Sequence, residues 1–290
     1  MCVALHFRWD AGKSVRLMGL AKSLRRFPGV ALWNRFWTAW SYQRAPFWSV
    51  FRWTLSSRET TNFTYDLEPL NRQQLAAFIA HFSGVAVEKI FGYFEELEND
   101  AALKEHIARV TLENKKLRRA ADTQARFGRR IGWYALVRAR KPQIVVETGV
   151  DKGLGSCVLC AALLLNRSEG SPGTYYGTDI NPRAGALLCG PYAETGKILY
   201  GDSLESLAKL SEPVDLFIND SDHSAEYEAR EYALIESKLS PDALVLGDNA
   251  HVTPMLQEFA QHTGRGFLFF KEVPSKHWYP GGGIGVAFKR

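Results

Sequence analysis

The sequence lacks several features that would place it in a specialised class. Four cysteines in 290 residues are too few for a disulfide scaffold, and they show no zinc-ligand spacing. Twelve prolines and 24 glycines exclude a collagen-like or proline-rich chain. No apolar run reaches the roughly 18 residues that a membrane-spanning helix needs; the run at 157–165 has the size of a core helix. With 46% hydrophobic and 23% charged residues, the chain is expected to fold.

The cysteines and the N-terminus bear on the compartment. Cys157 and Cys160 form a C-x-x-C within an apolar stretch that predicts a helix. Reactive thiols need electropositive, accessible surroundings, so we interpret both as buried helix residues. Residues 1–30 lack the long apolar region of a secretory signal, and we expect a reducing, cytoplasmic location. Because these residues are Arg-rich and acid-poor, a transit peptide stays open as an alternative.

Negative charge is scarce in the first 60 residues. They hold 10 Lys and Arg against 2 Asp and Glu, a net of +8. The rest of the chain holds 26 and 29, a net of −3, so the overall charge of +5 comes from the N-terminus. Six of the eight tryptophans lie there too. We therefore treat residues 1–60 as a separate basic, aromatic segment.

Aromatic side chains in this segment recur with helical spacing. One predicted helical face carries Trp33, Phe36, Trp37 and Trp40. We expect Pro46 to interrupt the helix, after which residues 47–51 restart the aromatic stripe. Two interpretations stay open: peripheral contact with a membrane through residues 30–55, or packing on the rest of the chain or on a second copy. Nucleic-acid binding is disfavoured, because the cations are spread among bulky apolar groups.

Residues 61–125 predict a helical cap region. Asn71 is expected to cap a helix whose apolar face includes Leu75 and Ile79, and Gly84 to end it. Leu103, Ile107 and Val110 predict another helix, and a further one covers about 129–140, before Pro142.

Residues 126–290 alternate strands with helices, which predicts an α/β fold with a Rossmann-like, mostly parallel sheet. Helical stretches are expected between the first five strands. The last two have no helix between them and are expected to pair antiparallel, with the final strand antiparallel to the rest. The seven predicted strands are 144–147, 174–179, 198–200, 214–219, 243–248, 267–273 and 284–288.

Glycines and acids follow the first three of these strands. The first strand leads into Glu147, Gly149, Gly153 and Gly155, a spacing that lets a ligand approach the backbone but differs from the dinucleotide motif. Asp179 ends the second strand, where an acid can accept both ribose hydroxyls. Asp202 and Ser203 follow the third, although Asp202 has helix capping as an alternative role. Together they predict a site for an adenosine ligand without a pyrophosphate.

Oxygen-bearing side chains also end the fourth and fifth strands. Asp220 follows the fourth, in a D-x-D-H pattern, and Asp248 with Asn249 ends the fifth. Because parallel strands end at one edge of a sheet, we expect these three to converge. Such donors suit a hard cation such as Mg²⁺, and helix capping with solvation is the alternative.

These motifs resemble those of class I S-adenosylmethionine-dependent methyltransferases. The matching segments are ETGVDKGLG, GTDINP and GDS, within residues 126–290. The resemblance implies that Glu147 and the turn from Gly149 to Gly155 hold the amino-acid part of S-adenosylmethionine. It also implies that Asp179 binds its ribose, and that Asp202 and Ser203 lie near adenine.

The acids after the fourth and fifth strands resemble those of metal-dependent O-methyltransferases of the catechol, caffeoyl-CoA and macrolide-sugar types. The resemblance implies Asp220, Asp248 and Asn249 as metal ligands. His223 stands where the catechol-type enzymes have a lysine base, and we expect it to take the proton from a substrate hydroxyl beside Asp220. His251 is the competing base.

The sequence therefore predicts an O-methyltransferase, Mg²⁺-dependent, acting on a hydroxyl of a sugar, glycolipid or small natural product. A phenol or catechol acceptor and a non-catalytic adaptor are the alternatives. We expect residues 277–279 to form a substrate wall or a packed hairpin turn. Nucleic-acid substrates are disfavoured, because no N-P-P-Y or Pro-Cys motif is present; homo-oligomerisation stays open.

Overall fold

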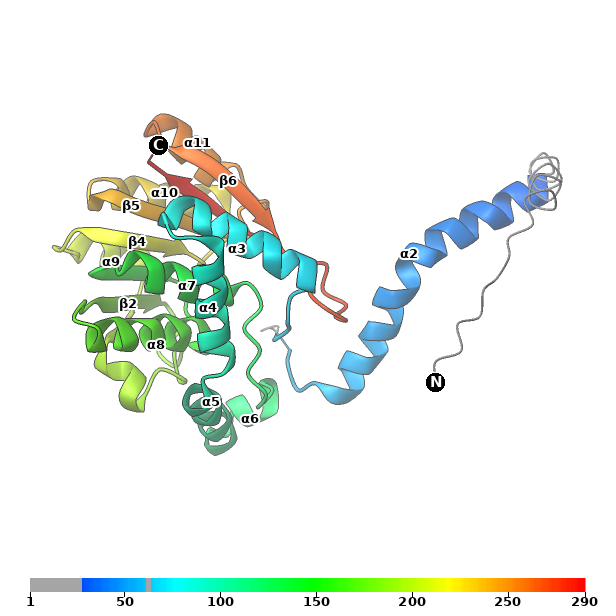
Figure 1. The fold of residues 1–290 in the computed structure, drawn as a ribbon, viewed down its shortest axis with the longest axis horizontal. Helices are drawn as coiled ribbons and strands as arrows, with labels where there is room; N and C mark the ends of the chain where they lie inside the picture. Colours follow the sequence, from blue (N-terminus) through cyan, green and yellow to red (C-terminus); the bar gives the residue numbers. More distant parts are fainter. Residues whose placement is uncertain (1–27, 61–63, 290) are drawn as a thin grey trace, which may run out of the picture.

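The computed structural model describes residues 28–60 and 64–289, so Cys2 and the basic residues before Pro28 lie outside it. The described part contains an α/β unit and one long helix, α2 (Pro28–Ser56), which runs away from that unit (Figure 1).

Seven strands form one sheet in the order β3-β2-β1-β4-β5-β7-β6. The first five in sequence pair parallel, while β7 runs antiparallel to both of its neighbours. The predicted Rossmann-like sheet is confirmed, including the antiparallel last strand and its pairing with the sixth. The strands are β1 (Ile144–Thr148), β2 (Thr174–Asp179), β3 (Gly196–Tyr200), β4 (Val214–Asn219), β5 (Leu239–Asp248), β6 (Gly266–Lys271) and β7 (Gly283–Phe288).

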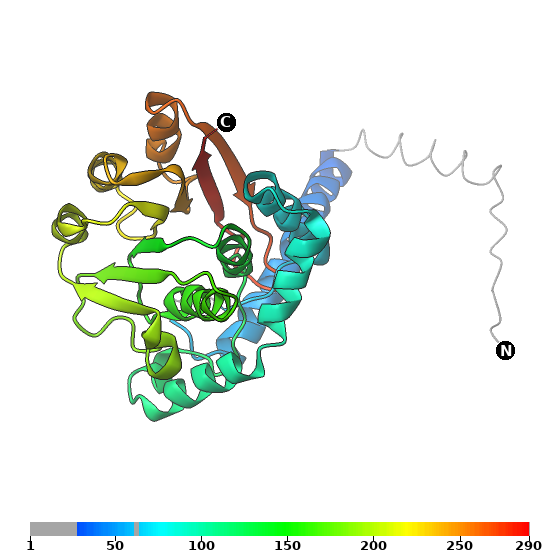
Figure 2. The same ribbon diagram turned by 60° about the vertical axis from the view of Figure 1, so that its left-hand side comes forward.

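Helices cover both faces of this sheet (Figure 2). On one side α3, α4, α5, α7 and α8 share a core with Val145 of β1 and Leu216 of β4; on the other, α9, α10 and α11 share a core with the next residues, Val146 and Phe217. Successive residues point to opposite faces of a strand, so buried strands are apolar throughout. The helices are α3 (Pro69–Ser83), α4 (Val87–Glu98), α5 (Ala101–Glu113), α6 (Leu117–Ala120), α7 (Arg130–Arg140), α8 (Leu154–Ser168), α9 (Ser203–Lys209), α10 (Ala225–Glu236) and α11 (Met255–His262).

Three local predictions were wrong. The β2–β3 connection holds only a short 3₁₀ helix, η1 (Gly190–Glu194), because Pro182, Pro191 and intervening glycines oppose a regular α-helix. Asn71 does not cap α3, which begins at Pro69; instead Asn71 is buried and bonds to the backbone of Lys271 and Val273.

The third concerns Pro46, which lies inside α2 and does not end it. A proline removes one helical hydrogen bond and bends a helix, but the remaining bonds carry α2 through. Gly84 does end α3, in the left-handed conformation at φ 69°.

Within residues 28–60 and 64–289 no single helix has the length and hydropathy to cross a membrane; α3 and α4 pass that test only when combined across their 116° bend.

Candidate functional site

A cavity of about 650 Å³ lies at the carboxyl ends of the parallel strands, where β1 separates β2 from β4. Ligands of open α/β sheets bind at such a point, because the connections leave in opposite directions there. Of the predicted site residues the cavity is lined by Glu147, Gly149, Gly155, Asp179, Asp202, Ser203, Asp220, Asp248 and Asn249. Gly153 and His223 are not in that lining.

Steric constraints explain why glycine occupies three positions of the β1–α8 turn. Gly149 has φ +81°, and a Cβ there would collide with the backbone carbonyl of Asp220. A Cβ on Gly155 would stand 2.7 Å from Oε1 of Glu147. Gly153, at φ +90°, packs on Gly185 instead of facing the cavity. The turn therefore keeps its backbone close to β4 and leaves the cavity floor open.

Glu147 lies almost fully buried beneath this turn. Its carboxylate accepts hydrogen bonds from Tyr175 and Ser156. Burial raises its pKa to about 7, and these hydrogen bonds oppose the rise. Glu147 can therefore meet a cationic ligand group as a carboxylate near neutral pH, as its predicted role requires; that role stays a prediction.

Asp179 ends β2 and reaches back to the turn. Its Oδ2 accepts from the backbone N–H groups of Val150 and Asp151 at 3.2 and 3.1 Å, and its Oδ1 accepts from that of Asn181 at 2.8 Å. A carboxylate oxygen has more than one acceptor direction, so these bonds orient Asp179 in the cavity wall and leave room for ribose hydroxyls.

Asp202 and Ser203 both line the cavity and also make hydrogen bonds that stabilise the fold. Asp202 caps α9 by accepting from the Leu204 N–H at 2.8 Å, which is the capping alternative from the sequence. Its Oδ1 also accepts from Tyr227 Oη, and Ser203 bonds to the buried Glu231. Tyr227 lines the same cavity and was not predicted.

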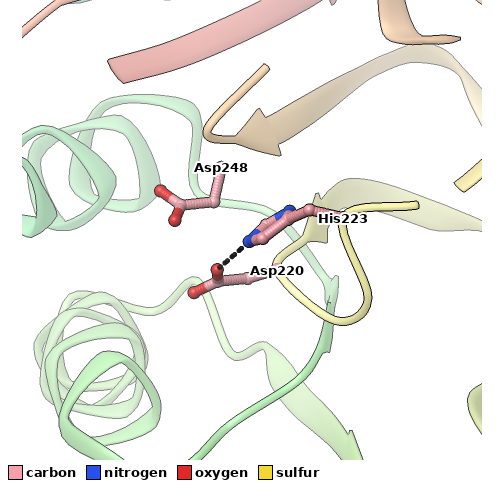
Figure 3. Close-up of side chains that lie close together, drawn as sticks. All are labelled: Asp220, His223 and Asp248. Atoms are coloured by element: carbon pink, nitrogen blue, oxygen red, sulfur yellow. Dashed lines mark ion pairs between the residues drawn. The ribbon is translucent and has the colours of Figure 1, made fainter. Parts of the chain in front are cut away.

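Asp220, His223 and Asp248 converge from the ends of β4 and β5 (Figure 3). One ligand atom from each lies within 4.8 Å of the other two. Removal from water and the neighbouring Asp248 raise the pKa of Asp220 well above its usual range. Although burial opposes its ionisation, Asp248 keeps a lowered pKa because Arg129 lies against it. Arg129 therefore favours the ionised form of Asp248, and the charge of Asp248 disfavours the ionised form of Asp220.

Arg129 is the main residue that sequence reasoning missed. It immediately precedes α7, is buried, and donates from Nε and Nη2 to the two carboxylate oxygens of Asp248. Its Nη1 donates to Tyr65 Oη at 3.0 Å and lies 3.5 Å from Glu272 Oε1. Glu272 is fully buried and accepts from Tyr65 at 2.6 Å. This guanidinium is the counter-ion of two buried acids beside the cavity.

His223 lies between three polar neighbours. Its Nδ1 is 3.5 Å from Glu228 Oε1, and its Nε2 is 3.8 Å from Asp220 Oδ1 and 3.3 Å from Asn249 Nδ2. Interaction with Glu228 raises the pKa of His223, because the carboxylate stabilises the imidazolium, while burial opposes the shift. An Nδ1 proton directed at Glu228 leaves Nε2 as the basic nitrogen.

The donor chemistry suits a hard cation, but the conformation fits one only in part. Both oxygens of Asp248 are held by Arg129. Asn249 turns its amide nitrogen to Asp248 at 3.0 Å, and a nitrogen that donates cannot ligate a metal. A cation would have to displace Arg129, and the Asn249 amide would have to rotate. The predicted ligand set Asp220, Asp248 and Asn249 is therefore brought together, while its metal binding stays a prediction.

Of the other residues singled out in the sequence, some lie at the cavity and others lie away from it. His251 is exposed beside Phe269, whereas His223 lies 3.8 Å from the cavity-lining Asp220, and this difference favours His223 as the base. Tyr279 does line the cavity, as the wall prediction requires. Cys157 and Cys160 are fully buried in α8, and burial raises both thiol pKa values, that of Cys160 to about 12. They are packing residues, as predicted.

Comparison with known proteins supports the domain and leaves the acceptor open. Residues 146–250 match a family model described as a methyltransferase domain. No sequence among the curated proteins matches this chain.

Solved structures with a similar fold include three methyltransferases. An O-methyltransferase from Bacillus cereus, in complex with S-adenosylhomocysteine, is 16% identical over 66% of this chain and 92% of its own, at TM-score 0.47. TomG of Streptomyces achromogenes, an O-methyltransferase involved in tomaymycin synthesis, is 18% identical over 66% and 90%, at 0.48. The Podospora anserina methyltransferase PaMTH1 is 16% identical over 70% and 94%, at 0.46.

Proposed function

We propose that this chain, which carries a methyltransferase domain of the class I S-adenosylmethionine-dependent type, transfers a methyl group to a hydroxyl oxygen. One observation carries the proposal: the acids that end β1, β2, β4 and β5 line a single cavity over the glycine turn. The family match of residues 146–250 covers the same strand ends.

The charge of the cavity suits this cofactor. Seven acidic residues and two arginines line it. S-adenosylmethionine carries an ammonium and a sulfonium group, which such acids attract, and one carboxylate, which an arginine can bind. Asp179, which three backbone N–H groups hold in the cavity wall, would bind the ribose. Glu147 is buried at the end where the glycine turn would receive the amino-acid part.

His223 is the proposed base. Its Nε2 would take the proton of an acceptor hydroxyl, and Glu228 behind Nδ1 would stabilise the resulting imidazolium. Asp220, which lines the cavity 3.8 Å from that nitrogen, would hold the hydroxyl beside it. Alignment of the oxygen with the methyl group can supply about 7–11 kcal/mol of the barrier.

We include magnesium in the proposal as a candidate ligand of the site, not as a group that the proton transfer requires. A divalent cation held by Asp220 and Asp248 would supply Lewis acidity toward the acceptor oxygen. Because Arg129 already neutralises Asp248, no step above depends on that cation. Calorimetric titration of Mg²⁺ into the wild type and into Arg129→Met separates the two cases: tight binding by both supports a resident ion, and binding only by the variant supports arginine in its place.

For the acceptor we propose a sugar or glycolipid hydroxyl, with a small phenol or catechol as the second candidate. His223 in place of the catechol-type lysine favours the first. The resemblance to macrolide-sugar enzymes favours it as well.

The first experiment measures cofactor binding by the full chain. A site that binds S-adenosylhomocysteine at 100 times its Kd stabilises the fold by about 2.7 kcal/mol. We expect this shift in the wild type and its loss in Asp179→Ala. No shift at millimolar concentration would reject the cofactor and leave the adaptor alternative.

The second experiment tests the base with a matched pair of substitutions. After labelled-methyl transfer to extract fractions has identified an acceptor, His223→Gln is expected to lower kcat by about 10²- to 10⁴-fold without changing S-adenosylhomocysteine affinity. His251→Gln, the same change at the exposed histidine, is expected to be neutral. The reverse result would assign the base to His251.

A further inference from the structure

Helix α2 presents aromatic side chains to solvent along most of its length. Their exposed fractions run from 43% to 62% in the set Trp33, Phe36, Trp37, Phe47, Trp48 and Phe51. Large apolar side chains exposed together on one element mark a contact surface. We call these six residues the aromatic face.

The aromatic face is continuous through the proline. Ring contacts link Trp33 to Phe36 and Phe36 to Trp40, then Trp40 to Phe47 at 5.6 Å and Phe47 to Phe51 at 5.1 Å. Pro46 therefore bends α2 without dividing the stripe. At a 1.5 Å rise per residue, the 29 residues of α2 extend about 43 Å.

Within residues 28–60 and 64–289, the ring contact that attaches α2 to the α/β unit lies outside the aromatic face. The contact is made near the C-terminal end, where the Trp53 ring lies 5.2 Å from that of Trp278. Trp53 is partly buried, whereas residues 32–39 are all exposed. The N-terminal part of α2 runs away from the sheet and its helices (Figure 1). Within the described residues the aromatic face is therefore left exposed, and of the packing interpretation the second copy stays open.

The charge around the face is of one sign. Residues 11–58 contain nine Lys and Arg and no acid. Within α2 the charged residues are Arg35, Arg44 and Arg52. A second copy of α2 would bring further positive charge and no carboxylate to pair with it.

We propose that the aromatic face of α2 binds an anionic lipid surface, with the helix lying in the plane of the interface. Tryptophan rings favour the boundary between headgroups and acyl chains, and each nearby arginine gains from anionic headgroups. The long arginine side chains can reach the phosphates while the rings enter the apolar layer. A Trp-rich helix of this length whose charged residues are all basic is suited to binding an anionic lipid surface.

The test is co-sedimentation of the full chain with vesicles of phosphatidylglycerol and phosphatidylcholine in equal parts, and with phosphatidylcholine alone. We expect binding to the anionic vesicles, and about tenfold or more weaker binding by the triple variant Trp33→Ser, Phe36→Ser, Trp37→Ser. The matched control is Asn34→Ala, Thr38→Ala, Ser41→Ala, three exposed changes in the same turns away from the aromatic face. It should bind like the wild type.

Three results would overturn the proposal. The first is equal sedimentation of wild type and the aromatic variant; the second is equal binding to both vesicle types. The third is self-association in sedimentation velocity that the aromatic variant abolishes, with no vesicle binding by the wild type, which would assign the face to a second copy. None of these readouts uses the cofactor, so the inference stands apart from the proposed methyl transfer.

Discussion

The strand-end cluster and helix α2 distribute the same kinds of residue in opposite ways. In the cluster, Asp248 and Glu272 are buried and Arg129 is their partner. In α2, arginines and aromatic rings face solvent, and no acid accompanies them. A buried charge needs a partner within the fold, while an exposed charge is solvated by water and remains available to a partner molecule. The comparison predicts that substitutions in the cluster lower the stability of the fold. Substitutions in α2 are expected to change only its binding to a partner.

The largest effect is expected from removing the cluster's cation. Arg129→Met leaves Asp248 and Glu272 buried without their counter-ion, which should lower the free energy of unfolding by about 3–5 kcal/mol. Arg129 lowers the pKa of Asp248, so its contribution is present above the ordinary carboxyl pKa and is lost as pH falls. The deficit measured by urea unfolding should therefore shrink as pH falls below about 4.

Arg126→Met is the control for that substitution. Arg126 is 42% exposed and lies 3.7 Å from the exposed Asp66, so its removal should matter by less than about 1 kcal/mol. Equal losses in the two variants would mean that burial does not distinguish these two ion pairs.

A smaller effect is expected in the turn under the cavity. Gly149→Ala and Gly170→Ala both place a Cβ at positive φ, +81° and +84°, which costs roughly 1–2 kcal/mol in each. Only at Gly149 does the Cβ also meet the Asp220 backbone; nothing lies within 4 Å at Gly170. We expect Gly149→Ala to be the less stable variant by at least about 1 kcal/mol. It should also bind S-adenosylhomocysteine about tenfold less tightly, and identical melting curves and affinities would contradict the close approach.

The pH dependence of the reaction gives a subtler test. Because Glu228 raises the pKa of His223, the neutral base predominates only above a midpoint higher than the usual value of 6.5. kcat/KM should rise with pH through that midpoint, and Glu228→Gln should move it lower. Asp220, Asp248 and Arg129 also face this histidine, so the shift is read against wild type in the same buffer series. An unchanged midpoint would remove Glu228 from the mechanism.

The smallest effect is expected in α2. Trp33→Ala removes a ring that is 60% exposed and should change the free energy of unfolding by no more than about 0.5 kcal/mol. Trp133→Ala, at a fully buried ring, should lower it by about 3–5 kcal/mol. A large loss from Trp33→Ala would show that the aromatic face serves the fold, against the contrast drawn above.

Local patterns were sufficient for much of the sheet. The strand at 214–219 has apolar residues at the successive positions 216 to 218, and Asp220 follows it directly, so the strand position and the shared edge could be predicted. The glycine turn could be predicted too, since few residues other than glycine accept its backbone angles. Helix boundaries were less certain: Asn71 has the chemistry of a cap but bonds to β6, a choice that depends on residues 200 positions away.

The sequence by itself determined which strands carry acids at their ends and which helix carries aromatic rings, because both follow from periodicity along a short stretch of chain. Only the tertiary structure decided how those acids are neutralised. Arg129, Tyr65 and Glu272 are separated by 64 to 207 positions and share no local pattern, so their meeting under Asp248 depends on the packing of the whole sheet. It also showed that, among the described residues, the aromatic face is exposed, because burial depends on neighbouring elements and not on the helix itself.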